Sequence, residues 1–370
     1  MKKSNSSLTY ARLGIDRKSR EKSQTTIQSL LAQEADKYEQ GKPVRLPFGY
    51  LYPFSRNQEY YYDLQIEGVG TKTLLAELSG RYNTIGIDGV AMVANDVLRS
   101  GALPLLVSDG IHEGKSDSKV LRSILEGVRA GAAMADCPLA SGETGEVQEI
   151  LHLPISKGSL PFDLFVSCLG VAEREEVILG EISLDDCIIG LDSSGIHSNG
   201  LTLARKILLR HWGGVYDNDA VPDGLDHSIL QELMEPTRIY VKALKKLKHE
   251  RIRVKAAIHI TGDGLAKFWR LLKWQKSGST LGVRLELSKT PQIFRLIMSA
   301  ARTKGTPITT KEMLRTFNMG VGFALVVAPE ECPFVLDCLN NEFAANKIGT
   351  VSDGGRISVK SPLSEKALFI

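Results

Sequence analysis

The feature that most constrains the fold is the alternation of short, apolar, strand-like runs with segments of helical periodicity along 370 residues. The strand-like runs are Tyr60–Ile66, Pro104–Ser108, Phe162–Val171, Cys187–Leu191, Lys255–Ile260, Gly282–Leu287, Gly320–Val327 and Lys347–Val351. Helical periodicity occupies Thr26–Tyr38, Asn83–Ser100, Ser118–Asp136, Gly200–Leu209, Ser228–His249, Gly264–Lys273, Pro291–Arg302 and Cys332–Asn341. This mixed order predicts an α/β or α+β fold.

The length of the chain predicts two domains. The run Glu173–Asp186 is polar and rich in turn-forming residues, so we place the boundary there. The expected domains are residues 1–174 and 175–370.

Composition excludes several classes of protein. The chain has 46 Lys and Arg against 43 Asp and Glu, a net charge of +3, and no basic cluster interleaved with aromatic residues, which argues against nucleic-acid binding. No run approaches the roughly 18 apolar residues of a membrane span. None of the five cysteines forms a C-x-x-C pair, as expected for buried free thiols in a reducing compartment. We expect a soluble cytoplasmic protein.

The loop Glu67-Gly68-Val69-Gly70-Thr71-Lys72 follows a predicted strand. It can bring backbone N–H groups, a metal ligand and a cation to one polyphosphate. It is not a P-loop, because the order Gly-Lys-Ser/Thr is absent. Taken alone, the pattern fits a phosphate site and an ordinary tight turn equally well.

The predicted helix after this loop carries polar residues among apolar ones. Asp88 and Asn95 are seven residues apart and fall on nearly the same face, roughly 10 Å apart along the axis, with Asp96 about 80° further round. Such carboxylates are costly to bury unless they are paired, hydrogen-bonded or bound to metal. The alternative is an Asp near the helix start and an exposed Asn-Asp end.

A third acidic segment is Ser141-Gly142-Glu143-Thr144-Gly145-Glu146, predicted as a turn after an apolar run. A carboxylate in such a turn suits Mg²⁺, although a solvated acidic loop explains it as well. Together these segments supply hard oxygen ligands without a competing His/Cys cluster, which favours magnesium with ATP. The candidate metal ligands are Glu67, Asp88, Asn95, Asp96 and Glu143.

Loops in the second half of the chain are candidates for substrate binding. Ser193–Gly200 joins a predicted strand to a helix, so His197 could bind an oxyanion or transfer a proton. Alternatively, Ser198 or Asn199 only caps the helix. His259 begins a similar loop but is more typical of a core histidine. Arg315 could clamp a phosphate or lie on the surface.

In this order the segments resemble the phosphoribosylformylglycinamidine cyclo-ligase family, the aminoimidazole ribonucleotide synthetases. The similar motifs are Tyr10-x-x-x-Gly14-Ile15-Asp16, Glu67–Lys72, Asn83–Asp96, Gly142–Thr144, His197–Gly200, Pro236–Lys242, Thr261–Gly264 and Arg315–Gly322. Family members usually have Asp at the position of Glu67 and Gly at that of Asp263. Sister families fit less well: selenophosphate synthetases use a cysteine or selenocysteine near the N-terminus, for example, whereas the first cysteine here is Cys137.

The resemblance implies ATP-dependent closure of formylglycinamidine ribonucleotide to aminoimidazole ribonucleotide, with Mg²⁺, in a homodimer whose N-terminal sheets join into a barrel. It implies ATP contacts from Gly68, Gly70, Thr71, Lys72, Asn95 and Asp96, and substrate contacts from His197, Ser198, Asn199, Arg315 and Asn318. Catalytic roles fall to His197, Asp88 and Lys72, and Asp88→Ala is expected to abolish turnover while leaving the fold largely intact. Two alternatives remain open: an ATP-dependent enzyme acting on another amide, and a nucleotide-binding relative without turnover.

Overall fold

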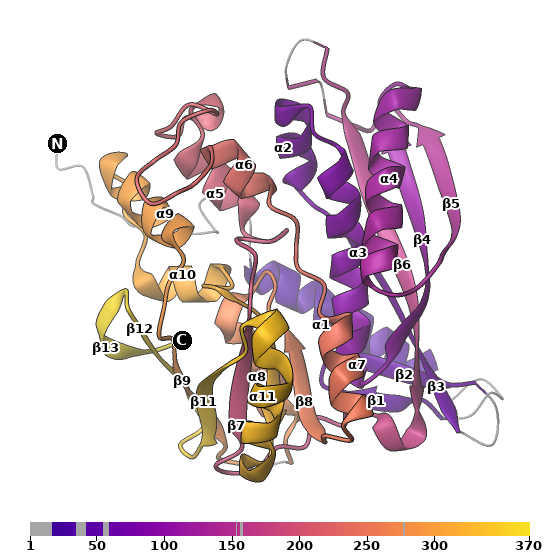
Figure 1. Ribbon diagram of the computed structural model, residues 1–370, viewed down its shortest axis with the longest axis vertical. Coiled ribbons are helices and arrows are strands. Elements are labelled where there is room, and N and C mark those ends of the chain that lie inside the picture. Colours follow the sequence, from indigo (N-terminus) through magenta and orange to yellow (C-terminus); the bar gives the residue numbers. More distant parts are fainter. Residues whose placement is uncertain (1–16, 35–41, 55–58, 153, 156–157, 277) are drawn as a thin grey trace.

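Two mixed sheets lie side by side with helices between them (Figure 1). The computed structural model describes residues 17–34, 42–54, 59–152, 154–155, 158–276 and 278–370. The motif at Tyr10–Asp16 lies outside these residues, as does the end of the helix predicted at Thr26–Tyr38. No helix in the described part of the chain is long and apolar enough to cross a bilayer.

The N-terminal half, up to Glu173, forms a six-stranded sheet of order β1-β2-β3-β6-β4-β5. Its strands are β1 (Val44–Leu46), β2 (Gly49–Pro53), β3 (Tyr60–Gly68), β4 (Leu103–Glu113), β5 (Leu139–Glu146) and β6 (Phe162–Glu173). Its helices are α1 (Arg17–Glu34), α2 (Lys72–Ser79), α3 (Asn83–Val97) and α4 (Ser118–Met134). Alternate residues of β6 are buried, so only one face of this sheet meets the core.

Helices α3 and α4 cover that inner face and cross at two glycines. A Cβ on Gly86 would lie 2.2 Å from the backbone nitrogen of Val128, and one on Gly127 would lie 1.9 Å from the carbonyl oxygen of Asn83. No larger residue fits at either position without moving a backbone. The close crossing fixes the orientation of α3, whose other side faces the C-terminal half.

The C-terminal half, from Cys187, forms a seven-stranded sheet of order β13-β12-β9-β11-β7-β10-β8. Its strands are β7 (Cys187–Asp192), β8 (Val254–His259), β9 (Gly282–Glu286), β10 (Val321–Val327), β11 (Asn346–Ser352), β12 (Ile357–Ser361) and β13 (Ser364–Phe369). Its helices are α5 (Leu201–Leu208), α6 (Ile229–Met234), α7 (Val241–His249), α8 (Phe268–Trp274), α9 (Gln292–Thr303), α10 (Thr310–Thr316) and α11 (Cys332–Phe343). Every residue of β10 is buried, which places it at the centre of the core.

Two predicted elements were wrong. The helix expected over Ser228–His249 is interrupted after α6, because Pro236 has no backbone N–H to donate and cannot continue a helix. The segment expected as a turn at Ser141–Glu146 belongs to β5, an edge strand whose residues are mostly exposed and therefore lack alternating hydrophobicity. All five cysteines are free thiols, as expected.

Candidate active site

The polar side of α3 faces the C-terminal half, and Asp88 is its most heavily bonded residue. The Oδ1 of Asp88 accepts hydrogen bonds from the Thr237 backbone nitrogen at 2.8 Å, the Thr237 hydroxyl at 2.6 Å and the Ser198 hydroxyl at 2.9 Å. Asp88 is fully buried. A buried carboxylate with this many donors holds the two halves of the protein together.

Lys72 completes the environment of Asp88. Its Nζ lies 2.7 Å from the Asp88 Oδ2 and donates a hydrogen bond of 2.7 Å to the carbonyl oxygen of Glu235. Both side chains are fully buried, so this is a buried ion pair. The Lys72 ammonium group therefore points into the contact between the halves and not toward the preceding loop.

The loop before Lys72 is open to solvent. Gly68 and Gly70 are exposed, and Gly70 has a φ of +58°, a conformation that glycine adopts without strain. The hydroxyl of Thr71 is 3.0 Å from that of Thr202, on α5 across the contact between the halves. The loop therefore presents backbone atoms to solvent at the edge of that contact.

Asn95 and Asp96 also bond across the contact. The Nδ2 of Asn95 donates to the carbonyl oxygen of Arg238 at 2.8 Å, and its Oδ1 accepts from the Tyr240 backbone nitrogen at 2.9 Å. The Asp96 carboxylate pairs with Arg99 at 2.9 Å and with the Nδ1 of His259 at 2.8 Å. Burial alone would raise the pKa of Asp96, but these cationic and hydrogen-bonding neighbours outweigh it and hold that pKa below its ordinary value.

His197 lies at the centre of the Ser193–Gly200 loop with a φ of +65°, which is uncommon for a residue with a side chain. Its Nε2 accepts a hydrogen bond of 3.1 Å from the Ser194 backbone nitrogen, which assigns the proton to Nδ1. That Nδ1 is buried with no hydrogen-bond partner among the described residues. Burial, with repulsion from nearby cations, holds the pKa of His197 well below its ordinary value, so the ring is neutral.

Asn318 holds this loop in place. Its Nδ2 donates to the carbonyl oxygen of Gly195 at 2.8 Å, and its Oδ1 accepts from the Gly320 backbone nitrogen at 2.9 Å. The Nδ2 of Asn199 lies 3.8 Å from the sulfur of Met92 on α3. Arg315 is half-buried at the end of α10, where its backbone packs against Gly264.

The two glutamates predicted as metal ligands lie apart from this cluster and from each other. Glu67, on β3, pairs with Val166, which lies on the inner face of the sheet, whereas Glu143 lies on β5, three strands away from β3. Gly142 packs on the inner-face residue Asp109, so alternation puts Glu143 on the outer face. Both glutamates are exposed.

The five predicted ligands therefore do not fit a Mg²⁺ ion as they are arranged here. The carboxylates of Asp88 and Asp96 are engaged by protein donors and cations, and Glu67 and Glu143 are on opposite faces. Among the described residues, no three His, Cys, Asp or Glu side chains are grouped so that they could hold a metal.

Three buried polar residues near the site were not among the site residues predicted from the sequence. Thr237 supplies two of the bonds to Asp88; it lies in the Pro236–Lys242 motif, which was the signal that could have found it. Lys267 is buried and its Nζ donates to the Thr261 hydroxyl at 2.5 Å; burial lowers the pKa of Lys267 to about 8. Lys267 stands in an apolar segment, and this position is the sequence feature that could have identified it. Asp109 is a buried carboxylate with no hydrogen-bond partner among the described residues.

Two family models match most of the chain. The AIR synthase related protein N-terminal domain matches residues 51–172, and the C-terminal domain of the same family matches residues 185–361. The chain belongs to the AIR synthase related family. The resemblance found in the sequence motifs and the expected two-domain mixed fold are thereby confirmed.

Curated members of the AIR synthase related family that resemble this chain bear the name phosphoribosylformylglycinamidine cyclo-ligase. The protein from Thermococcus gammatolerans is 37% identical over 359 residues, covering 96% of this chain and 98% of its own. The protein from Methanothermobacter thermautotrophicus is 36% identical over 352 residues, covering 94% and 95%. That from Carboxydothermus hydrogenoformans is 38% identical over 292 residues, covering 78% and 80%.

Solved structures share the fold of this AIR synthase related chain at low sequence identity. A HypE–HypF complex matches with a TM-score of 0.59 and 16% identity, covering 93% of this chain and 98% of that one. AaThiL with AMPPCP and TMP matches with a TM-score of 0.57 and 15% identity, covering 93% and 95%. At such identities the likeness concerns the fold alone.

Proposed function

We propose that this protein catalyses the ATP-dependent ring closure of formylglycinamidine ribonucleotide to aminoimidazole ribonucleotide, as a step of purine biosynthesis. The observation that carries the proposal is a likeness over nearly the whole length of the chain to cyclo-ligases, 37% identical over 359 residues in one case. Both family domains are present in one chain. The protein is then an ATP-dependent ligase that forms a C–N bond.

The reaction begins with transfer of the γ-phosphoryl group of ATP to the formamide oxygen. An amidine-side nitrogen then attacks the activated carbon, and phosphate leaves with the former formamide oxygen. Such chemistry depends on positioning and on compensation of charge. We assign the phosphates of ATP to the exposed loop at Gly68, Gly70 and Thr71, where the side of Gly70 on which a Cβ would stand is open space.

The remaining predicted contacts come from several segments of both halves. Neutral His197, which carries a hydrogen on a buried Nδ1, is the candidate to hold or donate a proton. Lys72, Asn95 and Asp96 remain assigned to ATP, and Ser198, Asn199, Asn318 and Arg315 to the ribonucleotide. Because Lys72 and His197 are buried where the halves meet, their contact with ligands requires those halves to separate. Magnesium stays a prediction of the family resemblance.

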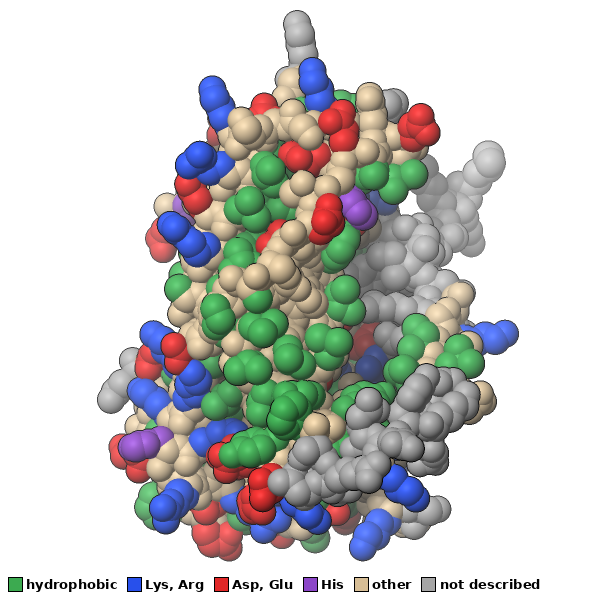
Figure 2. All heavy atoms as spheres, turned by 90° about the vertical axis from the view of Figure 1, so that its right-hand side faces the viewer, with side chains coloured by type: hydrophobic (Ala, Val, Ile, Leu, Met, Phe, Trp, Pro, Cys, Tyr) green, Lys and Arg blue, Asp and Glu red, His purple; other side chains and the backbone are tan. Residues whose placement is uncertain are grey.

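We also propose a homodimer and a division of the chain into domains at residues 1–174 and 175–370. Figure 2 shows hydrophobic side chains gathered on the outer face of the N-terminal sheet. Leu64, Ile66 and Leu105 are exposed by 68%, 66% and 47%, and large exposed apolar surfaces mark sites of association. Packing of two such faces would produce the expected barrel.

A steady-state assay with purified protein tests the proposed function. Formylglycinamidine ribonucleotide and MgATP are expected to give ADP and aminoimidazole ribonucleotide in equal amounts. ADP release only with a different formamide would support an enzyme with another substrate. Nucleotide binding without ADP release above background would support the relative that lacks turnover.

A further inference from the structure

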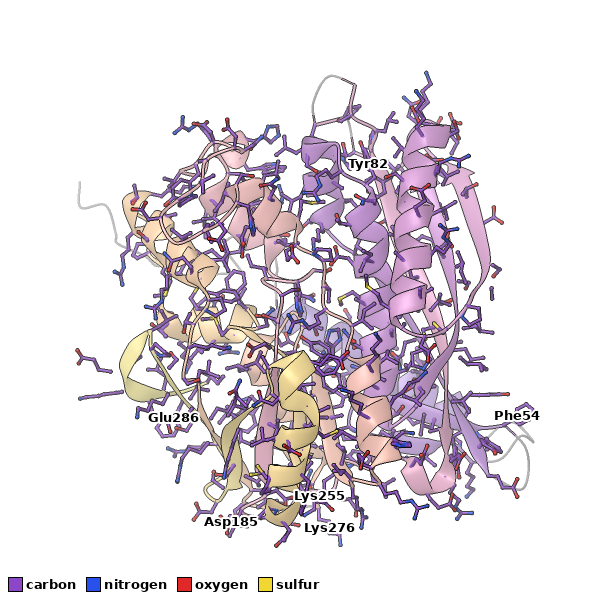
Figure 3. The ribbon with its side chains drawn as sticks, in the orientation of Figure 1. Phe54, Tyr82, Asp185, Lys255, Lys276 and Glu286 are labelled. Carbon is purple, nitrogen blue, oxygen red and sulfur yellow. The ribbon has the colours of Figure 1, made fainter. Side chains whose placement is uncertain are left out.

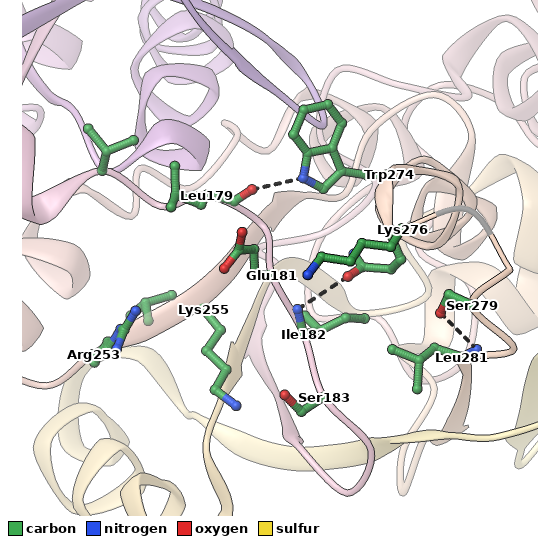
Figure 4. A pocket seen from close by; sticks show the side chains of 13 residues that line it. Leu179, Glu181, Ile182, Ser183, Arg253, Lys255, Trp274, Lys276, Ser279 and Leu281 are labelled. Carbon is green, nitrogen blue, oxygen red and sulfur yellow. Dashed lines mark hydrogen bonds between the residues drawn. The ribbon is translucent and has the colours of Figure 1, made fainter.

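A cavity of about 610 Å³ lies in the C-terminal half, beside the segment that joins the halves (Figure 4). We call it the linker cavity. Its walls come from Val177–Ser183, from Arg253–Lys255 where β8 begins, and from the residues Trp274, Gln275, Lys276, Ser279 and Leu281 at and beyond the end of α8. Ligand-binding pockets are commonly about 300–1,000 Å³. In Figure 3 the labelled Lys255 and Lys276 lie at the opposite end of the molecule from Tyr82, which precedes α3.

The start of β8 presents three consecutive residues to the linker cavity, although neighbours in a regular strand point to opposite faces. The cause is an irregularity in the pairing with β10, where Val327 pairs with Val254 and Val326 with Ala256. In this register Lys255 has no pairing residue on β10, as in a β-bulge. Both basic residues, Arg253 and Lys255, therefore line the same cavity.

The opposite wall is held by hydrogen bonds. The indole nitrogen of Trp274 donates to the carbonyl oxygen of Leu179 at 2.9 Å, and the Nε2 of Gln275 donates to that of Gly180 at 2.9 Å. Gly180 has a φ of +78°, and a Cβ there would lie 2.4 Å from Pro47. These hydrogen bonds and the close approach at Gly180 hold this wall of the linker cavity in place.

The charges of the linker cavity favour an anion. Arg253, Lys255 and Lys276 line it against one carboxylate, Glu181. Lys255 bonds to Asp186 at 2.6 Å, but neither Arg253 nor Lys276 forms an ion pair or side-chain hydrogen bond in the described structure. Figure 4 shows both lysines and Arg253 around the opening. Two cations without protein partners at one opening can bind a phosphate group.

The apolar walls favour an organic body attached to that anion. Val177, Leu179, Ile182, Val254 and Leu281 line the cavity together with the indole of Trp274. We propose that the linker cavity is a binding site for a phosphate ester with an apolar or aromatic body, whose phosphate is bound by Arg253 and Lys276. This site is separate from the loop to which we assign ATP, and its test does not depend on catalytic activity.

Calorimetric titration with 1-naphthyl phosphate and with inorganic phosphate tests the proposal. Arg253→Glu and Lys276→Glu change exposed side chains, so both variants are expected to fold. Each is expected to bind 1-naphthyl phosphate about tenfold or more weakly than the wild type, because a charged hydrogen-bond partner is lost and replaced by repulsion. Cyclo-ligase turnover is expected to stay unchanged. The matched control is Lys366→Glu, on the edge strand β13 at the far side of the sheet from β8, and it should bind as the wild type does.

The remaining outcomes also decide the proposal. Binding that is equally strong in the Arg253, Lys276 and Lys366 variants would place the ligand elsewhere and overturn it. Absence of binding to the wild-type protein would overturn it too. Inorganic phosphate should bind more weakly than the naphthyl ester, because it leaves the apolar walls uncovered; equal affinities would contradict the apolar part of the site.

Discussion

At the scale of single residues, Asp88 and Lys72 form the polar centre of the contact between the halves. A buried ion pair gains stability only when its remaining hydrogen-bonding positions are satisfied. Here Thr237, Ser198 and the Glu235 carbonyl satisfy them. The sequence indicated that a buried Asp88 must be ion-paired, hydrogen-bonded or bound to metal. In the structure Asp88 is both ion-paired and hydrogen-bonded. The hydrogen-bond donors Ser198 and Thr237 could not be predicted, because they lie more than a hundred residues away from Asp88 in the sequence.

Asp88→Ala is therefore expected to lower the free energy of unfolding by about 3–5 kcal/mol, because Lys72 is left as an uncompensated buried charge. This revises the expectation that the fold would be largely unaffected. Urea denaturation measures the change. The double variant Asp88→Ala/Lys72→Met should be more stable than Asp88→Ala alone. A single variant within about 0.5 kcal/mol of the wild type would contradict the role assigned to the pair.

His197 predicts a dependence of stability on pH. Its pKa in the folded protein is lowered, whereas the unfolded chain has a pKa of about 6.5. As the pH falls below about 6.5, the unfolded chain takes up a proton that the folded protein excludes, so stability is lost; above that pH both states are neutral and nothing is lost. The free energy of unfolding should therefore fall more steeply from about pH 7.5 to about pH 5.5 in the wild type than in His197→Gln. Parallel pH profiles would show that His197 takes up its proton in the folded state.

At the scale of elements, the crossing of α3 and α4 positions the polar stripe of α3. The sequence predicted both helices, α4 from buried residues that repeat along one face and α3 from a long, mostly apolar run that the fold buries on nearly every side. It could not predict β5, whose residues are mostly exposed, nor the break between α6 and α7, where the segment 235–240 supplies backbone partners to Lys72 and Asn95. The residue types of the site were readable in the sequence, whereas the segments that meet them depend on tertiary structure.

Gly127→Ala should destabilise the protein by about 1–3 kcal/mol, because the added methyl group collides with the backbone of α3. Thermal or urea unfolding measures the difference. The neighbouring substitution Glu126→Ala, at an exposed position of the same helix, should change stability by less than about 0.5 kcal/mol. Equal effects of the two substitutions would mean that α4 moves to accept the methyl group without cost.

At the scale of the whole molecule, the two halves contact each other through α3 while the opposite face of the N-terminal sheet remains open (Figures 1 and 2). That open face predicts association with a second copy. Ile66→Lys introduces a charge on the exposed apolar face and should convert the dimer to a monomer in sedimentation velocity experiments, without loss of secondary structure. Lys366→Glu, on β13, should sediment as the wild type. A monomeric wild-type protein, or a dimer that tolerates the lysine, would contradict this interface.

In the proposed reaction, ATP activates the formamide oxygen before the ring closes. The most direct measurement uses formylglycinamidine ribonucleotide carrying a heavy oxygen isotope in the formyl group, with turnover followed by mass analysis of the released phosphate. One labelled oxygen is expected in phosphate for each aminoimidazole ribonucleotide formed, in step with ADP release. Label recovered in water instead of phosphate, or no ring closure at all, would contradict it.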